Sequence, residues 1–272
     1  MKPIALVVIF LSCFVFSFSQ STPEEYCNKG LAQLNAGNAR EAAMMFNDAI
    51  LINNDYHYAY YLRGRANIEK ENFTRAIQDF DRVIKKCPDS ANYFYYRAKT
   101  KNIVGVFIES ILDYNKSIEL NPENLEAYHG RMASKFDLGD YKAALREMEG
   151  IMEREPEAAE HYRYRGFIKH HLRKYKDALA DYGKAIEMNP KFAEAYFDRA
   201  ITKNKTKNLS GAMEDYKMAI ELDGTYNDPA IIDGVESYLD GDEKNACRYW
   251  KKANKLSKPF AEVLIDEFCE KQ

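Results

Sequence analysis

The sequence predicts an all-α solenoid built from about seven helical hairpins. A pattern of 34 residues recurs from residue 23 to residue 260 without an insertion or a deletion, and its positions are numbered from residue 23 as position 1. Within the pattern, position 8 is usually Gly or Ala, position 20 is nearly always Ala, and position 24 is usually aromatic. Because self-similarity at a fixed period of this length is typical of stacked units, we expect a long array whose units contact only their neighbours.

The first element of the chain is a predicted signal peptide over residues 1–19. Residues 4–18 are almost entirely apolar, and small residues precede a cleavage site between Ser19 and Gln20. The apolar stretch is shorter than the ~20 residues that a membrane-spanning helix needs. We therefore expect an exported chain, with membrane association only if the leader is retained or if Cys13 is lipidated.

Each repeat is then predicted to be a pair of helices, at positions 1–14 and 16–30 of the pattern. The first pair begins at Thr22-Pro23, a typical N-cap followed by proline in the first turn. Four repeats have glycine at position 15, where a left-handed backbone ends a helix: Gly37, Gly105, Gly139 and Gly241. Four repeats end their second helix with proline at position 32: Pro88, Pro122, Pro156 and Pro190.

Together with aromatic residues at position 4 and small residues at position 27, this pattern resembles the tetratricopeptide repeat family. The resemblance covers seven repeats, 23–56, 57–90, 91–124, 125–158, 159–192, 193–226 and 227–260. Apolar residues in the segment 261–272 predict a capping helix over the last hairpin. The family implies antiparallel helix pairs stacked into a right-handed superhelix, with a concave groove lined mainly by the first helices.

A ladder of opposite charges runs through the five middle repeats. Position 7 is arginine in these repeats, at Arg63, Arg97, Arg131, Arg165 and Arg199. Position 23 is acidic in the same repeats, at Asp79, Asp113, Glu147, Asp181 and Asp215. Because the first and last repeats lack both the arginine and the acidic residue, with Lys29 and Met45 or Asp233 and Tyr249 in their places, we expect the two to pair between the helices of a hairpin. Lysines at position 11, which include Lys135, are expected either to share the same carboxylate or to form a basic stripe for an anionic partner.

The groove positions that the family implies are rich in aromatic residues with a few cations. In the middle repeats they are Tyr58, Tyr61, Arg65, Tyr95, Tyr96, Lys99, His129, Phe136, Arg163, Tyr164, Phe167, His170 and His171. Tyrosine and arginine are favoured where a few residues carry most of the binding energy. We expect these residues to bind a peptide or protein, and the alternative is that about half of them pack against neighbouring helices.

Chemistry at a metal or a cofactor is not expected. The adjacent His170 and His171 point about 100° apart on a helix, so they do not easily hold one ion together. No nucleophile motif, phosphate loop or CxxC pair occurs in the sequence, so we expect neither an enzyme nor a small-molecule substrate. A net charge of −3 and a pI of about 6.0 argue against a nucleic-acid partner.

Outside the leader, four cysteines are spread along the chain. Cys27 and Cys87 lie in different repeats and are interpreted as small packing residues. Cys247 in the last repeat and Cys269 in the capping segment can meet if the cap folds back, and an exported chain can oxidise them. We expect separate buried thiols at these two positions, with a disulfide as the alternative.

The leading hypothesis is a non-enzymatic scaffold that binds a protein or peptide of unknown identity in its groove. The leader and the repeats together resemble exported proteins of the Bacteroidetes, which implies the periplasm or the outer membrane of a Gram-negative bacterium. One alternative is a structural subunit of an envelope or secretion assembly that uses the convex face or the ends of the array. A second alternative is a lumenal protein that resembles a co-chaperone.

Overall fold

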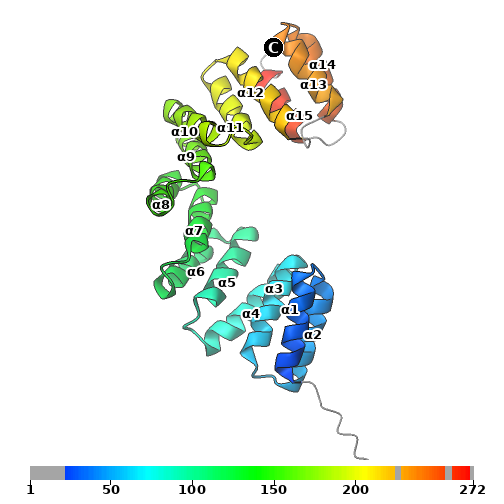
Figure 1. The fold of residues 1–272 in the computed structure, drawn as a ribbon, viewed down its shortest axis with the longest axis vertical. Coiled ribbons are helices and arrows are strands. Elements are labelled where there is room, and N and C mark those ends of the chain that lie inside the picture. The colour runs from blue at the N-terminus through cyan, green and yellow to red at the C-terminus, as the bar shows by residue number, and fades with distance from the viewer. Residues whose placement is uncertain (1–21, 224–227, 255–258, 270–272) are drawn as a thin grey trace, which may run out of the picture. The chain divides into compact units, whose positions relative to one another are not determined.

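The structure, a computed structural model, describes residues 22–223, 228–254 and 259–269 (Figure 1). The predicted signal peptide at 1–19, including Cys13, and the final residues of the predicted cap, 270–272, lie outside these ranges. Within them, the chain forms fifteen α-helices and no β-strand, which confirms the predicted all-α class. None of the helices in these ranges is long and apolar enough to cross a membrane.

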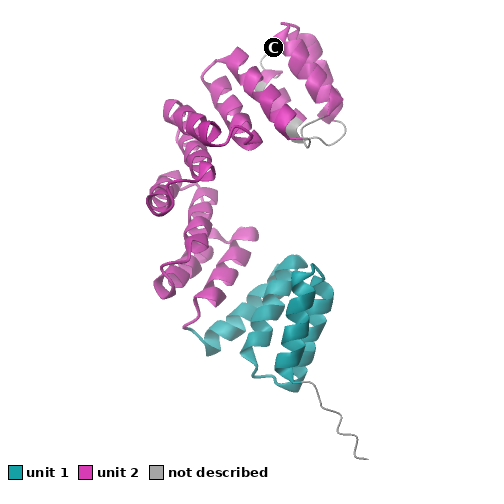
Figure 2. Ribbon diagram, viewed as in Figure 1, with its two compact units in different colours: residues 1–88 teal, residues 89–272 magenta. Residues whose placement is uncertain are grey.

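The chain divides into two compact units, residues 1–88 and 89–272, which Figure 2 shows in different colours. Consecutive helices pack in pairs within each unit, joined by short turns. Unit 1 contains the pairs α1 (Pro23–Asn35) with α2 (Ala39–Ile52) and α3 (His57–Glu69) with α4 (Phe73–Lys86). Unit 2 contains α5 (Ala91–Ile103), α6 (Phe107–Leu120), α7 (Leu125–Asp137), α8 (Tyr141–Arg154), α9 (Ala159–His171), α10 (Tyr175–Met188), α11 (Ala193–Lys205), α12 (Leu209–Leu222), α13 (Pro229–Leu239), α14 (Glu243–Asn254) and α15 (Pro259–Phe268).

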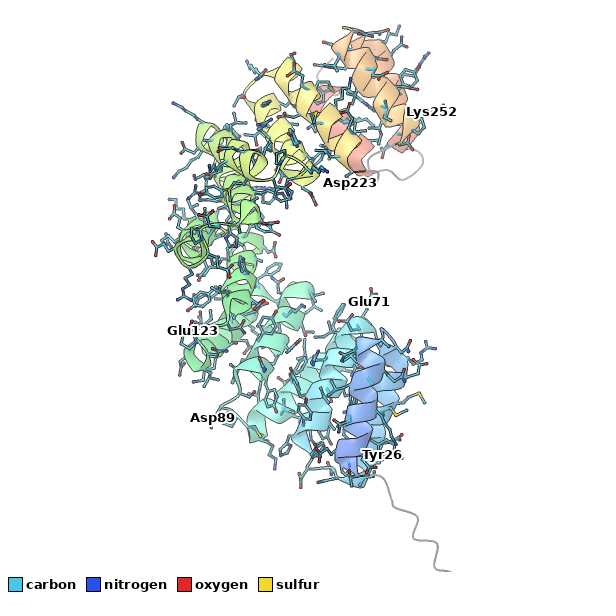
Figure 3. The ribbon with its side chains drawn as sticks, viewed as in Figure 1. Tyr26, Glu71, Asp89, Glu123, Asp223 and Lys252 are labelled. Carbon is cyan, nitrogen blue, oxygen red and sulfur yellow. A yellow bond between two sulfur atoms is a disulfide. The ribbon has the colours of Figure 1, made fainter. Side chains whose placement is uncertain are left out.

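The turn inside every helix pair contains one residue with a left-handed backbone. Four of these residues are the predicted glycines at position 15, with φ between 79° and 86°. In the other three pairs the same position has no glycine, yet Glu71, Arg173 and Lys207 adopt φ values of 56°, 59° and 63°. Figure 3 labels Glu71 at the turn between α3 and α4. The geometry of the hairpin therefore fixes this conformation whether or not the sequence provides glycine.

Where position 8 is glycine, the close approach of the two helices in the pair depends on it. A Cβ atom built on Gly64 would lie 2.7 Å from the Phe80 ring, and one on Gly234 would lie 2.2 Å from the Trp250 ring. Both rings are fully buried, and each belongs to position 24 of the same pair as the glycine that it covers. The aromatic residue thus fills the space that the missing side chain leaves, so a larger residue in place of either glycine would overpack the joint.

The predicted charge ladder is confirmed in all five middle repeats. Each arginine donates from both Nε and Nη2 to the two carboxylate oxygens of its partner, at 2.5 to 3.1 Å. The acidic side chains are buried, with 5–8% of their surface exposed. Each carboxylate therefore joins the first helix of a pair to the second through a two-pronged, charge-assisted contact.

The lysines at position 11 bind the same carboxylates as the arginines, which confirms the expectation that the two cations share one acid. Lys169 Nζ lies 2.7 Å from Asp181 Oδ2, and Lys203 Nζ lies 2.8 Å from Asp215 Oδ2. In the second repeat Asn67 replaces the lysine and donates its amide to Asp79 at 3.3 Å. These cations are engaged inside the hairpins, which argues against their forming a basic stripe for a partner.

Cys247 and Cys269 form a disulfide, which corrects the expectation of two separate buried thiols. Cys247 lies on α14 and Cys269 directly follows α15, and their Cα atoms are 5.7 Å apart. Phe268 packs 5.8 Å from the Trp250 ring, so α15 folds back on α14 and brings the two sulfur atoms together. The repeat period predicts only contacts that recur from one repeat to the next. The cap lies after the last repeat, so the period does not predict the contact between Cys247 and Cys269.

Candidate protein-binding surface

The three predicted binding residues of unit 1 all lie on α3 but differ in exposure. Tyr61 is buried, with 7% of its surface exposed, and its ring packs 6.4 Å from that of Phe80. Tyr58 stacks on Tyr61 at 5.9 Å and is 41% exposed. The Arg65 guanidinium lies over the Tyr61 ring at 5.7 Å. Tyr61 therefore supports the helix pair, while Tyr58 is well exposed and Arg65 is partly exposed.

On α5, the predicted residues are two packed tyrosines and one exposed lysine. The Tyr95 ring meets the Tyr96 ring at 5.1 Å and the Tyr114 ring at 6.1 Å, edge to face in both cases. Burial raises the pKa of Tyr95, so its hydroxyl stays protonated. Lys99 is exposed. Tyr95 thus has a packing role, and Lys99 is the exposed member of this group.

The first helices of neighbouring pairs lie side by side in unit 2, linked by their side chains. Asn102 Nδ2 on α5 donates to Ser134 Oγ on α7 at 3.0 Å. The equivalent contact between α9 and α11 joins His170 Nδ1 to Thr202 Oγ1 at 2.8 Å. Both bonds connect position 12 of one repeat to position 10 of the next. The predicted binding residue His170 therefore has a role in holding two helices together.

Between α7 and α9, position 12 is Phe136, and the two helices are joined there by packed rings. The Phe136 and Phe167 rings lie 5.2 Å apart, and the His171 ring lies 4.9 Å from Phe136 and 4.8 Å from Phe167. Tyr141, the first residue of α8, completes the group at 5.0 Å from Phe136. We call Phe136, Tyr141, Phe167 and His171 the α7–α9 aromatic cluster. Partial desolvation lowers the pKa of His171, which favours its neutral ring.

Tyr141 was not predicted as a binding residue, although the sequence contains a periodic signal for it. Position 17 of the repeat is aromatic in four successive repeats, at Phe73, Phe107, Tyr141 and Tyr175. This position starts the second helix, and the family pattern directs attention to the first helices instead. A search for any aromatic residue that recurs at the 34-residue period would have found it.

Arg163 and Tyr164 are neighbours on α9, but the first pairs with an adjacent helix and the second is exposed to solvent. Arg163 Nε donates to Asp198 Oδ2 on α11 at 2.7 Å, and Asp198 is buried. Burial raises the pKa of Asp198 to about 6, although the Arg163 charge pulls it down. Tyr164 is 41% exposed. Arg163 thus joins α9 to α11, and Tyr164 extends the surface beside the α7–α9 aromatic cluster, one helical turn before Phe167.

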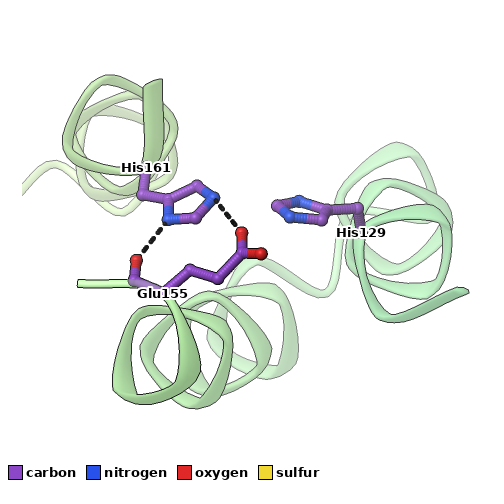
Figure 4. Close-up of side chains that lie close together, drawn as sticks. All are labelled: His129, Glu155 and His161. Carbon is purple, nitrogen blue, oxygen red and sulfur yellow. Dashed lines mark hydrogen bonds and ion pairs between the residues drawn. The ribbon is translucent and has the colours of Figure 1, made fainter. Parts of the chain in front are cut away.

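His129 lies apart from the aromatic cluster, in a group that sequence reasoning missed. His129, Glu155 and His161 are the one set of three described side chains whose ligand atoms are placed to hold a metal ion, all within 4.8 Å of one another (Figure 4). Burial lowers the pKa of His129, and the neighbouring His161 lowers it further. The three residues are spaced 26 and 6 residues apart, so no short motif marks them in the sequence.

The helix pairs, their glycine contacts and their turns fit one repeat family. A family model described as Tetratricopeptide repeat matches residues 27–91 and 171–227. Over these two segments the chain is similar to the tetratricopeptide repeat family. Such repeats generally bind proteins or peptides, and proteins built from them are typically non-enzymatic. None of the curated proteins compared with the chain matches it.

Solved tetratricopeptide repeat structures share the fold at low sequence identity. One from Parabacteroides merdae ATCC 43184 is 16% identical, with 90% of this chain and 98% of that chain covered and a TM-score of 0.71. The C-terminal part of a repeat protein from Cytophaga hutchinsonii is 19% identical, with 88% and 98% covered and a TM-score of 0.64. YrrB, described as a tetratricopeptide repeat protein with an unusual peptide-binding site, is 18% identical, with 66% and 92% covered and a TM-score of 0.53. The chain is thus structurally similar to repeat proteins of bacteria, including Bacteroidetes.

Proposed function

We propose that the chain is a non-enzymatic scaffold, outside the cytoplasm, that binds a peptide or protein partner on the surface of its first helices. The observation that carries the proposal is the α7–α9 aromatic cluster together with the exposed Tyr164. Aromatic side chains supply large contact areas and dominate the energy of most protein interfaces. A surface of this kind is suited to an extended peptide or a helix.

The way in which the cluster is supported favours tight binding. Each ring already packs against two others and is held by two helices, so its rotamer is restricted before a partner arrives. Ordering a side chain on binding costs roughly 0.5–1.5 kcal/mol, and a pre-ordered side chain avoids most of that cost. The neutral His171 ring adds polar atoms without a charge that a peptide would have to desolvate. YrrB, which shares the fold, offers a precedent for a peptide ligand.

Two observations support a place outside the cytoplasm, in the periplasm or at the outer membrane. Residues 1–19 have the charge, apolar length and small residues of a signal peptide. Cys247 and Cys269 form a disulfide, and structural disulfides are rare where thiols are kept reduced. A fusion of residues 1–19 to a reporter that is active only after export tests the location, and a reporter that stays inactive would contradict it.

Photo-crosslinking in cells tests the partner-binding surface. We would place a photoreactive amino acid at Tyr164 and, in a matched control, at Leu112 on α6, which is also well exposed, at 61%. The proposal predicts a crosslinked protein or peptide at position 164 and none of the same identity at position 112. A partner that crosslinks only at position 112 would overturn it.

A second candidate function has its own observation. Five exposed apolar residues gather at the end of α5 and along α6: Ile103, Val104, Val106, Ile108 and Leu112. Apolar groups that are contiguous and exposed mark interaction sites. We propose as the alternative that the chain is a structural subunit of an assembly and docks through this patch. The crosslink at position 112 described above is the result that would favour it.

A further inference from the structure

Three side chains from three different segments converge between the α7–α8 pair and α9 (Figure 4). His129 comes from α7, Glu155 directly follows α8, and His161 comes from α9. The His129 and His161 rings lie 5.2 Å apart between centroids, and His161 Nε2 lies 3.8 Å from Glu155 Oε2. All three ligand atoms lie within 4.8 Å of one another.

We propose that His129, Glu155 and His161 bind one Zn²⁺ ion, which ties the α7–α8 pair to α9. Two imidazole nitrogens and one carboxylate oxygen are a donor set that Zn²⁺ accepts, whereas Mg²⁺ and Ca²⁺ prefer sites made of oxygen atoms alone. Three protein ligands leave a fourth position of the tetrahedron for water. The site goes beyond the proposed function, because it does not depend on any partner.

His161 is already oriented as a metal ligand. Its Nδ1 atom lies 2.9 Å from the backbone carbonyl oxygen of Glu155, and a carbonyl oxygen can only accept a hydrogen bond. Nδ1 must therefore donate its proton, which leaves the lone pair of the neutral ring on Nε2, the atom that faces the Glu155 carboxylate. Histidine ligands of metals usually have such a hydrogen bond on the second nitrogen. The His161 ring is also buried, so its position is fixed.

The other two ligands have the freedom to move that binding requires. Tetrahedral Zn²⁺ with bonds of ~2.0–2.1 Å places its ligand atoms about 3.4 Å apart, so the group must contract. Glu155 is half exposed and His129 is only partly buried, so both side chains can move toward the fixed His161.

Titration of the metal-free chain with Zn²⁺ tests the proposal. The full chain would be produced without a polyhistidine tag, stripped with a chelator and studied by calorimetry with zinc chloride. The variants are Glu155→Gln, which keeps both imidazoles and the backbone carbonyl, and His129→Gln. The control is His171→Gln, which removes an exposed imidazole of the α7–α9 aromatic cluster. Circular dichroism establishes that each variant is folded.

We expect one Zn²⁺ per wild-type chain, and a dissociation constant that rises by about tenfold or more in Glu155→Gln and in His129→Gln. The control should bind as the wild type does. Zn²⁺ should also raise the Tm of the wild type by more than that of His129→Gln at the same Zn²⁺ concentration. Failure of the wild type to bind one equivalent, or equal binding by wild type and both site variants, would overturn the proposal. So would a loss of affinity in His171→Gln as large as that in the site variants.

Discussion

At the scale of single residues, one carboxylate in each middle repeat holds the helix pair together. In the fourth repeat, Glu147 accepts hydrogen bonds from Arg131 Nε at 3.1 Å and Nη2 at 2.5 Å, and it also pairs with Lys135. The Glu147 side chain is only 8% exposed. Removing Arg131 takes both of these hydrogen bonds from a buried carboxylate that then has Lys135 as its remaining partner, and such a change costs more than the pair itself contributes.

A double-mutant cycle on Arg131 and Glu147 measures this coupling. We expect Arg131→Ala and Glu147→Ala each to lower the free energy of unfolding. Because the second substitution removes the other member of an interaction that the first has already broken, the double mutant should lose less than the sum. The coupling free energy should be roughly 1–3 kcal/mol, measured by urea unfolding. Additive effects would mean that the two side chains do not interact.

The same carboxylate makes stability depend on pH in the acidic range. Burial raises the pKa of Glu147, but hydrogen bonds from Arg131 and Lys135 outweigh it, so the net shift is downward from 4.5. The folded state then binds this proton more weakly than the unfolded state does. Its stabilising contribution is therefore complete above about pH 4.5 and is lost as the pH falls through the lower, folded pKa.

We expect the difference in unfolding free energy between the wild type and Glu147→Gln to shrink as the pH is lowered below about 4.5. Urea unfolding of both proteins at a series of pH values gives this difference directly. A difference that stays constant over the whole range would show that Glu147 titrates in the folded state as it does in the unfolded state.

At this scale the sequence predicted contacts within a repeat and missed those between repeats. The pairing of Arg131 with Glu147 was predictable because the arginine and the acidic residue occur in the same five repeats and are both missing from the other two. The meeting of His129 with His161 was not, because it occurs once and has no equivalent elsewhere in the chain. A periodic pattern identifies contacts that recur, and a single functional cluster lacks that signal.

At the scale of the elements, the turn of each hairpin imposes its backbone on whichever residue is present. Arg173 has φ of 59°, in the left-handed region that side chains with a Cβ atom disfavour by about 1–2 kcal/mol. Glycine avoids that cost but loses roughly 0.5–1 kcal/mol more backbone entropy on folding. The native arginine is therefore a site of stored strain in the turn between α9 and α10.

We expect Arg173→Gly to raise the free energy of unfolding by about 0.5–1 kcal/mol. The reverse change at an equivalent turn, Gly139→Ala, is the matched control, because Gly139 has φ of 86° and a Cβ there meets no atom within 4 Å. That variant should lose stability through backbone strain alone. Denaturant unfolding compares both with the wild type, and destabilisation by Arg173→Gly would contradict the explanation.

The helices and four of the turns were predictable because glycine at position 15 and proline at position 32 are local signals. The left-handed turns at Glu71, Arg173 and Lys207 were not, since only the packing of the hairpin requires that backbone there. The disulfide between Cys247 and Cys269 depends on how α15 folds onto α14, which lies outside the period. Glycine and proline thus predict where helices end, whereas the three turns without glycine and the disulfide depend on tertiary packing.

At the scale of the whole molecule, some residues at the predicted groove positions pack inside the array and others are exposed. Tyr58 and Tyr61 show the separation on α3, since both were predicted to bind and only Tyr58 is well exposed. The repeat pattern assigns each residue a position, but the sizes of the neighbouring side chains decide whether it reaches the surface. The right-handed superhelix and its concave groove stay predictions.

The central claim is that exposed aromatic residues on the first helices bind a partner. Tyr164 is the strongest test, because it is 41% exposed and its removal should leave the helix pair intact. Truncation of an aromatic residue at the centre of an interface typically costs 2 kcal/mol or more, which corresponds to roughly a thirtyfold change in Kd. Leu112→Ala on α6 is the matched control for loss of an exposed apolar side chain.

The most direct measurement is therefore the Kd of the partner, once it has been captured by crosslinking, for the wild type, Tyr164→Ala and Leu112→Ala. Calorimetry or fluorescence anisotropy gives the three values under one set of conditions. Our account predicts that Kd rises by about tenfold or more in Tyr164→Ala and stays within about twofold of the wild type in Leu112→Ala. An unchanged Kd in Tyr164→Ala, with weakened binding in Leu112→Ala, would contradict it and place the interaction on the apolar patch of α5 and α6.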